Sequence, residues 1–562
     1  MASKVAKYDI SKSHTFDLEC TTLEPTQCWL AASVPLEDAS MERVELFYDL
    51  KSLINYIFSP RHKDHRFYAH NLSYDISFIW AWLRDNANNF EIKNVISPLM
   101  GGCMYCAIAY KGTTIHFYDT VPKFGGANLD SVISTYTDLK KGVTPIYETM
   151  GDVVIDDYNE EYCKIDALGL ALAIPKAMES GTSLTAPSDA YKHWDGIMEA
   201  KYTRQGRNKR YPAIPLEMDK DMRRGYRGGF TFLNPMYKDK VIDNVNRYDV
   251  NSMYPDKMRN CMLPYGKPQP VKTGKVVLKG VYKLGLQRVV FSSASVRNGY
   301  CPFIATSKGF RGTNSYDLEI FPKKGESRCV QILTLQELEK FLEYYEVEDL
   351  RYSGGWMFRG CEVDFNEFID ESWEQKSSSD PVIKNKGKLH MNSLYGKFAE
   401  SPDKPVMYVD FEGDIATVRP TGEVESRPKG YLPLGIFITS YSRLQLLEAI
   451  EDVGYDRFIY CDTDSVHTVA DGAECGLDLH PTRLGAWDYE GTFKQAKYLR
   501  AKRYMGIEQD DSTKVVCAGI NKRDLKEQVK DLEGFYEGRG INTRKFKNGV
   551  NGKHVKPQIT KI

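Results

Sequence analysis

The sequence has no apolar run that approaches the roughly 20 residues needed to span a bilayer. Residues 1–9 also lack the apolar core of a secretory signal peptide. The twelve cysteines are scattered and form one Cys-x-x-Cys, Cys103 to Cys106, with no second pair at zinc-finger spacing. We therefore expect a soluble protein of a reducing compartment, with Cys103 and Cys106 packed in a strand rather than bound to a metal.

An excess of charge of one sign is also missing, because 75 Lys and Arg residues balance 76 Asp and Glu residues. The net charge of −1 by itself indicates no particular partner. The charge is unevenly spread, however: residues 538–562 contain seven Lys or Arg and no acidic residue, which suits a solvated arm or a segment along phosphates. At 562 residues, the chain is expected to form several domains.

One acidic pattern interrupts this balance. Residues 458–467 place two apolar runs around a polar centre, which predicts a β-hairpin with Asp462 and Asp464 at its turn. Two carboxylates this close repel each other unless a cation neutralises them, and Mg²⁺ prefers such hard oxygen ligands. A lone Asp-x-Asp is more often a solvated turn, so the interpretation depends on what other stretches supply.

Three stretches in the first third of the chain carry further carboxylates at regular spacings. The acids are Asp17, Glu19, Asp75 and Asp166, accompanied by Asn71 and Tyr162. The first two lie two residues apart in a strand-like stretch and share one face, whereas the other two each follow their companion by one helical turn. Four such carboxylates can hold two cations for phosphodiester hydrolysis, with the hydroxyl of Tyr162 orienting the attacking water. The alternative for each acid taken singly is a helix cap or a surface charge.

Two motifs near the middle of the chain suit a nucleic acid. In residues 222–230, Gly228 and Gly229 would let the backbone approach a sugar-phosphate chain, and Tyr226 offers a stacking surface. A tight basic turn is the alternative. After it, a strand predicted to end at Asp249 supplies the third carboxylate that the hairpin lacks.

The segment behind that strand is predicted to open a helix at Pro255. Tyr254 would place a rigid ring under an incoming sugar, where it would collide with a 2′-hydroxyl group. Ordinary half-buried packing is the alternative for this tyrosine.

Residues 363–399 predict two helices broken at 377–381. In the second helix, four side chains fall on one stripe about 80° wide: Lys384, Lys388, Asn392 and Tyr395. Ammonium groups, an amide and a ring on one stripe match the phosphates, sugar and base of a nucleoside triphosphate. Gly396 would let the new base pair approach the backbone closely. A lysine-rich helix without such a motif is usually a solvated face.

Residues 249–254, 388–396 and 460–464 follow one another in the order of motifs A, B and C of family B DNA polymerases. The stretch Tyr226 to Gly229 resembles the link between exonuclease and polymerase domains in that family, and the acids of the first third resemble its 3′–5′ proofreading exonuclease. Over nearly the whole chain, the sequence is similar to the protein-primed branch, the phi29-type phage replicases. This resemblance implies an α+β multidomain fold, with an RNase-H-like exonuclease followed by a right-hand polymerase with two insertions.

The resemblance also implies the division of the chain. We expect the exonuclease domain at 1–190, palm segments at 191–260 and 431–530, fingers at 359–400 and the thumb at 531–562. Of the two terminal-protein-region insertions, the first, at 261–358, would contact the terminal protein, and the second, at 401–430, would help to enclose template and product, which confers strand displacement and processivity.

The same resemblance implies the site residues. Polymerase metals would be held by Asp249, Asp464 and the carbonyl of Val250, with Asp462 at the edge, and exonuclease metals by Asp17, Glu19, Asp75 and Asp166. The nucleotide would meet Tyr254, Lys384, Lys388, Asn392, Tyr395 and Gly396. DNA would be bound by His70, Asn71, Tyr74, Thr120, Lys141, Tyr226, Arg227, Gly228, Gly229, Thr439, Arg443, Lys502 and Tyr504. Cys20 and Ser442 depart from the family pattern.

The implied cofactors are two Mg²⁺ ions at each site, with Mn²⁺ as a substitute. The implied partners are template and primer DNA, deoxynucleotides and a terminal protein that primes synthesis, acting with a monomeric enzyme in the cytoplasm of a bacterial host. The alternatives are a family B polymerase that needs no primer or extends nucleic-acid primers, and a non-catalytic DNA-binding protein on the same scaffold. A standalone nuclease would leave motifs A to C without a purpose.

Overall fold

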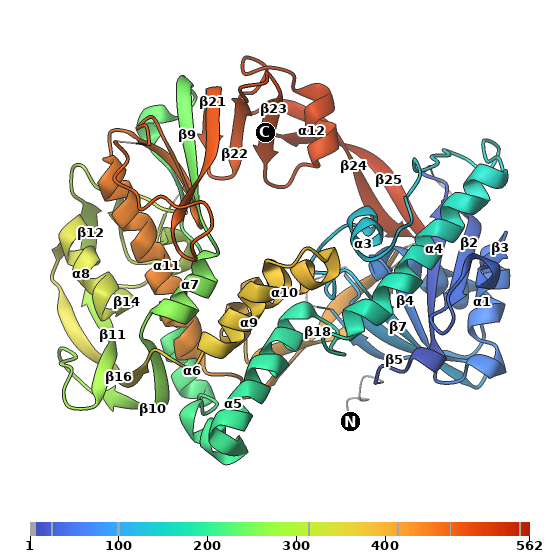
Figure 1. The fold of residues 1–562 in the computed structure, drawn as a ribbon, viewed down its shortest axis with the longest axis horizontal. Helices are drawn as coiled ribbons and strands as arrows, with labels where there is room; N and C mark the ends of the chain where they lie inside the picture. Colours follow the sequence, from blue (N-terminus) through green and yellow to red (C-terminus); the bar gives the residue numbers. More distant parts are fainter. Residues whose placement is uncertain are drawn as a thin grey trace.

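The computed structural model describes residues 7–23, 26–97, 102–312, 315–412, 415–472, 474–549 and 552–562. Two seven-stranded sheets lie at opposite sides of the molecule, and helices connect them (Figure 1). No helix within the described ranges is long and apolar enough to cross a membrane. All twelve cysteines are free thiols. Cys106 lies buried in the strand Tyr105–Tyr110, whereas Cys103, also buried, lies two residues before that strand, so its predicted position in a strand was wrong.

The first sheet is built from the N-terminal part of the chain in the order β3-β2-β1-β4-β7-β6-β5. Its strands are β1 (Ser13–Cys20), β2 (Cys28–Pro35), β3 (Glu45–Phe47), β4 (Arg66–Ala69), β5 (Phe90–Ile96), β6 (Tyr105–Tyr110) and β7 (Thr113–Asp119). Helices α1 (Leu50–Ile57), α2 (Leu72–Asn86), α3 (Leu129–Tyr136) and α4 (Asp157–Met178) accompany it. The central pairs β1–β4 and β4–β7 are parallel and the others antiparallel, so both faces of β1 are buried.

The second sheet has the order β23-β22-β21-β9-β20-β19-β8, and all its pairs are antiparallel. Its strands are β8 (Thr231–Leu233), β9 (Val241–Val250), β19 (Phe458–Asp462), β20 (Ser465–Thr468), β21 (Trp487–Arg500), β22 (Arg503–Ile507) and β23 (Thr513–Cys517). Helix α11 (Leu432–Val453) packs Leu446 and Ile450 into the same core as Val250 and Val466. The hairpin predicted at 458–467 is thus confirmed, and it lies beside β9.

A third group of strands follows β9 in the chain. It forms one sheet from β10 (Leu263–Val271), β16 (Arg351–Cys361), β11 (Tyr282–Phe291) and β14 (Cys329–Thr334), and a smaller one from β13 (Glu319–Ile320), β12 (Ser293–Val296) and β15 (Tyr345–Glu348). Helix α8 (Leu335–Tyr344) begins with a capping box of Thr334 and Glu337. Phe291 and Phe341 share a core with Leu446, so this group is packed onto the second sheet rather than extended into solvent.

Three helices stand between the two large sheets (Figure 1). They are α5 (Ala186–Arg210), α9 (Asn366–Lys376) and α10 (Pro381–Phe398), which pack on one another, while the shorter α6 (Leu216–Met222) and α7 (Met253–Asn260) join them to the second sheet. Asp380 caps α10, and Pro381 is its first residue. The break between two helices predicted at 377–381 is therefore confirmed.

Two hairpins approach the first sheet from distant parts of the chain. These are β17–β18 (Asp403–Glu412 and Ile415–Ser426) and β24–β25 (Gly540–Gly549 and Gly552–Lys561), the latter preceded by α12 (Lys522–Gln528). Ala416 and Val418 join the core of the first sheet, and β25 lies beside α2. The C-terminal part of the chain thereby returns to the N-terminal domain (Figure 1).

Some local predictions were wrong. Pro255 is the third residue of α7 rather than its first. Asn71 precedes α2 with a φ of 69° and is therefore not part of the helix that carries Asp75.

Candidate functional sites: two carboxylate centres

The first centre joins two strands that lie far apart in the sequence. In the register of β9 and β20, Asp249 faces Ser465, the residue after Asp464. The amide of Val250 donates a hydrogen bond to the carbonyl oxygen of Asp464 at 2.8 Å. This backbone bond fixes the hairpin turn against the end of β9 and brings the two carboxylates to one place.

Electrostatics at this centre favour a bound cation. Burial, followed by the charges of Asp464 and Glu490, raises the pKa of Asp249 to about 7. Burial and the charge of Asp462 likewise raise the pKa of Asp464 to about 6. Within the described residues, no Lys or Arg forms an ion pair with Asp249 or Asp464. Hard oxygen donors short of a counter-charge fit a divalent ion such as Mg²⁺.

Asp462, the other acid of the hairpin, is already neutralised. The ammonium group of Lys502 lies 2.8 and 2.9 Å from its two carboxylate oxygens, and the hydroxyl of Thr231 donates to it at 2.8 Å. The expected position of Asp462 at the edge of the centre fits this arrangement. Lys502, expected on DNA, forms this ion pair while its side chain stays 51% exposed, so its contact with DNA stays a prediction.

The predicted nucleotide stripe lies on the open side of α10. Lys384, Lys388, Asn392 and Gly396 are all exposed. The opposite face buries Met391, Leu394 and Phe398. Because one face of the helix is buried and the other exposed, the ammonium groups of Lys384 and Lys388 face solvent, where they can contact phosphates.

Two tyrosines, one from α7 and one from α10, stack on each other near the end of β9. The rings of Tyr254 and Tyr395 stack with centroids 3.9 Å apart and planes inclined by 17°. Burial, followed by its contacts with Tyr395, raises the pKa of Tyr254 well above the ordinary value. Each ring therefore restricts the movement of the other. A fixed ring is what Tyr254 needs if it is to exclude a 2′-hydroxyl group.

Sequence reasoning missed Lys376, the last residue of α9. Its ammonium donates to the hydroxyl of Ser252 at 3.0 Å, two residues before Tyr254. Burial, followed by the charges of Lys388 and Lys384, lowers the pKa of Lys376, whereas Asp249 opposes that shift. It thus links the lysine stripe to the carboxylates. A lysine at a helix C-terminus is common, so no sequence signal distinguished it.

The glycine link contacts the hairpin directly. The amide of Thr463 donates to the carbonyl oxygen of Phe230 at 2.8 Å. A Cβ on Gly229 would lie 2.5 Å from the hydroxyl oxygen of Thr463, so only glycine fits there. Gly228 and Gly229 are exposed and Tyr226 is half-buried, as a surface for nucleic acid requires.

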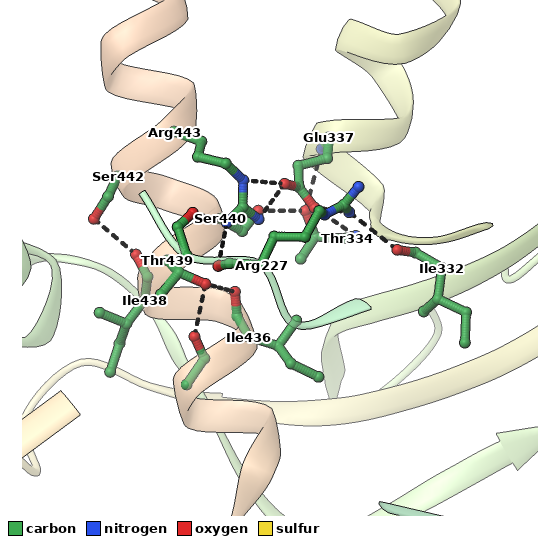
Figure 2. Close-up of polar contacts among 12 residues, drawn as sticks. Arg227, Ile332, Thr334, Glu337, Ile436, Ile438, Thr439, Ser440, Ser442 and Arg443 are labelled. Atoms are coloured by element: carbon green, nitrogen blue, oxygen red, sulfur yellow. Dashed lines mark hydrogen bonds and ion pairs between the residues drawn. The ribbon is translucent and has the colours of Figure 1, made fainter. Parts of the chain in front are cut away.

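Three residues expected on DNA are buried instead (Figure 2). The carboxylate of Glu337, at the start of α8, accepts from Arg443 at 3.0 Å and from Arg227 at 3.3 Å. Arg443 also donates to the carbonyl of Arg227 at 2.6 Å, and the hydroxyl of Thr439 donates to that of Gly435 at 2.9 Å.

These contacts leave the side chains of Arg227, Thr439 and Arg443 no exposed donor for a phosphate. Arg443 is 2% exposed, Arg227 5% and Thr439 1%. The prediction of direct phosphate contacts is therefore corrected: the Arg–Glu–Arg triad anchors the glycine link to α8 and α11. Breaking such a buried ion pair is strongly destabilising because it strands a charge.

The second centre lies on the first sheet and α4. One oxygen each of Asp17 and Glu19 and the sulfur of Cys163 lie within 4.8 Å of one another. Burial, followed by the charge of Asp166, raises the pKa of Asp17 to about 7, and burial with the charge of Asp17 raises that of Glu19 well above its ordinary value. Strand β1 and helix α4 thus hold three acids together, as predicted.

A lysine partly compensates these acids. Lys141 forms an ion pair with Asp166 and lies 4.9 Å from the ring centroid of Tyr162. Burial opposes the charge of Lys141, but Asp166 outweighs it and raises the lysine pKa. The other carboxylate oxygen of Asp166 is buried without a hydrogen-bond partner, so the centre has a free oxygen ligand for a cation.

The fourth acid, Asp75, is 2% exposed on α2. Burial, followed by contacts with Cys20 and the charges of Asp75 and Glu19, raises the pKa of Tyr74, so this ring lies near both acids. Cys20, which departs from the family pattern, lies next to Tyr74 and near Asp75. Tyr162 is 3% exposed, and its hydroxyl is 3.0 Å from that of Thr144.

The remaining DNA-binding predictions of this domain divide into two groups. Asn71 is exposed and Tyr74 half-buried. Thr120 is 2% exposed, and its hydroxyl lies 3.0 Å from His70 and 3.2 Å from the carbonyl of Ala69. The other ring nitrogen of His70 bonds to the carbonyl of Ala127 at 2.9 Å. Thr120 therefore orients His70 internally, and its expected direct contact is corrected.

Tyr504, the last predicted DNA contact, is 9% exposed and packs among Tyr460, His467 and Tyr498. The ring supports the hairpin from behind rather than facing outward. Its predicted contact with DNA is corrected for the same reason as that of Thr439.

Comparisons with known proteins agree with this arrangement. Residues 148–469 match the family described as DNA polymerase type B, organellar and viral. The DNA polymerase of Bacillus phage M2 is 33% identical over 516 residues, which cover 88% of this chain and 86% of that relative. The DNA polymerase of Bacillus phage phi29 is 32% identical over 591 residues and covers 98% of this chain and 96% of its own.

A solved structure of phi29 DNA polymerase with primer-template DNA and incoming nucleotides superimposes with a TM-score of 0.86 and 29% identity. It covers 98% of this chain and 100% of its own, so the likeness extends through both carboxylate centres. Fold, site and sequence lead to one assignment. The chain belongs to the type B DNA polymerases of organelles and viruses.

Proposed function

We propose that this DNA-directed DNA polymerase replicates DNA from a protein primer, displaces the strand ahead of it and proofreads at a separate 3′–5′ exonuclease centre. The observation that carries the proposal is the backbone bond from Val250 to Asp464, because it unites two carboxylates opposite an exposed lysine stripe. The order of the motifs and the similarity to the phi29 polymerase support it.

At the polymerase centre, Asp249, Asp464 and the carbonyl of Val250 are assigned to two Mg²⁺ ions, with Mn²⁺ as a substitute. Such ions lower the pKa of an attacking 3′-hydroxyl and neutralise charge on the leaving pyrophosphate. Lys384 and Lys388 clamp the triphosphate. The remaining nucleotide contacts are assigned to Asn392, Tyr395, Gly396 and Tyr254, the last excluding a 2′-hydroxyl group.

At the exonuclease centre, Asp17, Glu19, Asp75 and Asp166 are assigned to a second pair of ions. Tyr162 orients the attacking water, and Lys141 holds Asp166 ionised. His70, Asn71 and Tyr74 are assigned to the frayed 3′ end. The buried free oxygen of Asp166 and the raised pKa of Asp17 support a metal there.

The partners follow from the same assignment. Template, primer and deoxynucleotides are the substrates, since the solved phi29 polymerase holds primer-template DNA and incoming nucleotides. The insertions at 261–358 and 401–430 are assigned to the terminal protein and to enclosure of the DNA, in a monomer that works in the host cytoplasm. The divisions at 1–190, 191–260, 359–400, 431–530 and 531–562 stay predictions.

The central test replaces one polymerase carboxylate. Asp464→Ala should reduce primer extension at least about a hundredfold, because the charge that forms in the transition state loses its support. Degradation of single-stranded DNA should persist. The exposed Asp456→Ala serves as the matched control and should extend normally. Loss of both activities in Asp464→Ala with intact folding would contradict separate centres.

The protein primer is tested separately. A terminal protein offered with one labelled deoxynucleotide should become covalently labelled at a hydroxyl group, and the label should depend on Asp249. Extension of DNA primers without any transfer to protein would favour the nucleic-acid-primed alternative. Absence of both activities would favour a non-catalytic DNA-binding protein.

A further inference from the structure

Three histidines form a cluster on the first sheet, away from both carboxylate centres. His14 lies in β1, His62 in the short 3-10 helix Pro60–His62, and His65 directly before β4. Their ring centroids are 4.7, 5.1 and 5.2 Å apart. One nitrogen atom of each ring lies within 4.8 Å of those of the other two.

The cluster faces away from the exonuclease acids. Side chains alternate along β1, and Thr15 points toward α4, since its hydroxyl donates to the carbonyl of Ala167 at 2.8 Å. Asp17 shares that face. His14 points to the other side, where it stacks on Phe67 at 4.9 Å. The three imidazoles therefore form a separate site, not an extension of the carboxylate centre.

Hydrogen bonds leave lone pairs in the cluster. Nδ1 of His62 lies 2.8 Å from the carbonyl oxygen of Tyr56, which only accepts, so Nδ1 carries the proton and Nε2 keeps its lone pair. A backbone carbonyl behind a ring nitrogen is also the usual support of a metal-binding histidine. Nε2 of His14 and Nδ1 of His65 are 3.0 Å apart, and only one of them can hold a proton between them.

His14 itself is not satisfied by hydrogen bonds. Its Nδ1 is buried with no hydrogen-bond partner, and the ring is 7% exposed. Whichever tautomer His14 adopts, one buried nitrogen stays unpaired, which is costly in a protein interior. Hydrogen bonding joins His14 to His65, whereas His62 bonds to a backbone carbonyl and still approaches both rings.

The imidazoles are in the form that binds metals. Burial, followed by the neighbouring histidines, lowers the pKa of His14 to about 3, and burial with His62 lowers that of His65 to about 4. Burial also lowers the pKa of His62. Neutral imidazoles do not have to lose a proton when a cation binds.

Nearby charges select the kind of cation. Arg61, Arg43 and Lys12 act on the cluster, while Glu45 pairs with Arg61 at 3.7 Å and Asp9 acts on His65. The excess of positive charge disfavours hard ions that bind by electrostatics alone. Nitrogen donors favour Zn²⁺, Cu²⁺ or Ni²⁺, for which metal–imidazole bonding is intrinsically strong.

We propose that His14, His62 and His65 form a binding site for a borderline divalent transition metal, with Zn²⁺ as the reference ion, separate from the two carboxylate centres. Nitrogens on one tetrahedral Zn²⁺ ion are about 3.3 Å apart at the usual bond length, close to the 3.0 Å between His14 and His65. Half-buried His65 leaves solvent access for a fourth ligand.

Metal binding would join three segments at one end of the first sheet. The site connects the start of β1, the 3-10 helix after α1 and the start of β4. A ligand that binds only the folded state stabilises it in proportion to the logarithm of its concentration. We therefore expect Zn²⁺ to stabilise the exonuclease domain without taking part in hydrolysis.

The test titrates the full-length chain with Co²⁺ and Zn²⁺ in excess Mg²⁺, which occupies oxygen sites but not imidazoles. We expect one equivalent to bind, the intense visible absorption of tetrahedral Co²⁺, and a higher melting temperature with Zn²⁺. His65→Gln should weaken binding more than about tenfold. His116→Gln is the matched control, a histidine of the same sheet that bonds to Tyr105.

His14→Phe provides a second variant, because the new ring can stack on Phe67 in place of the imidazole. It should also lose Zn²⁺ binding while it extends primers normally, which shows that the chain is folded. Absence of tetrahedral Co²⁺ absorption in the wild-type chain would overturn the proposal. Zn²⁺ binding that persists unchanged in both His14→Phe and His65→Gln would overturn it as well.

Discussion

The two carboxylate centres differ in where a lysine compensates the repulsion among their acids. In the exonuclease centre, the compensating cation Lys141 contacts a predicted metal ligand, Asp166. In the polymerase centre, Lys502 neutralises Asp462 instead, and leaves Asp249 and Asp464 without an ion pair among the described residues. In the exonuclease centre, the positive charge thus contacts a predicted metal ligand. In the polymerase centre, it contacts a neighbouring aspartate instead.

This difference indicates how much each centre depends on metals for its charge balance. The polymerase acids repel each other across two strands, so their proximity is maintained by the backbone bond from Val250 to Asp464 rather than by a side chain. The exonuclease acids are more deeply buried. There, burial raises the pKa of Asp17, while Asp166 forms an ion pair with Lys141. Substitutions can separate these two designs.

The largest effect is expected from removing exonuclease ligands on two elements together. Asp17→Ala with Asp75→Ala should reduce degradation of single-stranded DNA at least about a hundredfold, because the hydrolytic transition state loses its charge support. Primer extension should persist, the reverse of Asp464→Ala. Asp85→Ala, at the exposed end of the same helix as Asp75, is the control. Degradation that survives the double substitution would remove the metal assignment.

The next effect concerns the counter-charge of the exonuclease. Lys141→Met should raise the pKa values of Asp166 and Asp17, because the lysine charge lowers both. Degradation at neutral pH should fall about tenfold, and the acidic limb of its pH profile should move to higher pH. Lys140→Met, which changes an exposed neighbour, should behave as the wild type. An unmoved pH profile would show that Lys141 does not set the ionisation of the acids.

A smaller effect is expected at the polymerase centre, because its lysine, Lys502, pairs with Asp462 and not with a predicted metal ligand. Lys502→Met should leave Asp462 unpaired beside Asp464 and reduce extension several-fold, because Lys502 lowers the pKa of Asp464. Adding Asp462→Asn should restore part of the loss, a coupling that a double-mutant cycle measures. Arg500→Met is the exposed control. Strictly additive losses would mean that the ion pair does not matter for extension.

The smallest effect is on stability. The pKa of Asp249 is raised to about 7, so the folded chain binds this proton more tightly than the unfolded chain does. That contribution to stability is full at pH values below the ordinary pKa of aspartate and is lost as the pH rises through about 7. In metal-free protein, Asp249→Asn should therefore raise the melting temperature most at pH 8.

The gain from Asp249→Asn should shrink as the pH falls from 8 toward 4, because wild-type Asp249 becomes protonated in the folded chain. Excess Mg²⁺ should cancel or reverse the gain, since only the wild-type carboxylate binds the ion. Thermal unfolding followed by circular dichroism at several pH values measures both effects. A gain that is independent of pH would assign the effect to packing rather than to charge.

Pattern and spacing were sufficient for much of the architecture. Alternating apolar runs located the hairpin of Asp462 and Asp464, and helical spacing placed Tyr162 with Asp166 on α4. The stripe of α10 is exposed as its spacing predicted, because the opposite face carries the apolar residues that the core needs.

The buried polar residues were beyond such reasoning. Helix α11 is surrounded by other elements, so Thr439 and Arg443 are enclosed although their spacing suits a surface. Glu337, which binds Arg443, lies more than 100 residues away in the chain, and so does Ser252, whose hydroxyl accepts from Lys376. Local periodicity cannot distinguish a paired, buried arginine from a free one.

Composition, motif order and spacing therefore determined the kind of enzyme and identified most of the candidate acidic ligands, because metal chemistry requires oxygen donors at fixed positions along strands and helices. The tertiary structure decided which Lys and Arg side chains face solvent and which form internal ion pairs. It also brought His14, His62 and His65 together from separate segments. Such pairings depend on long-range contacts between elements, which no short stretch of sequence contains.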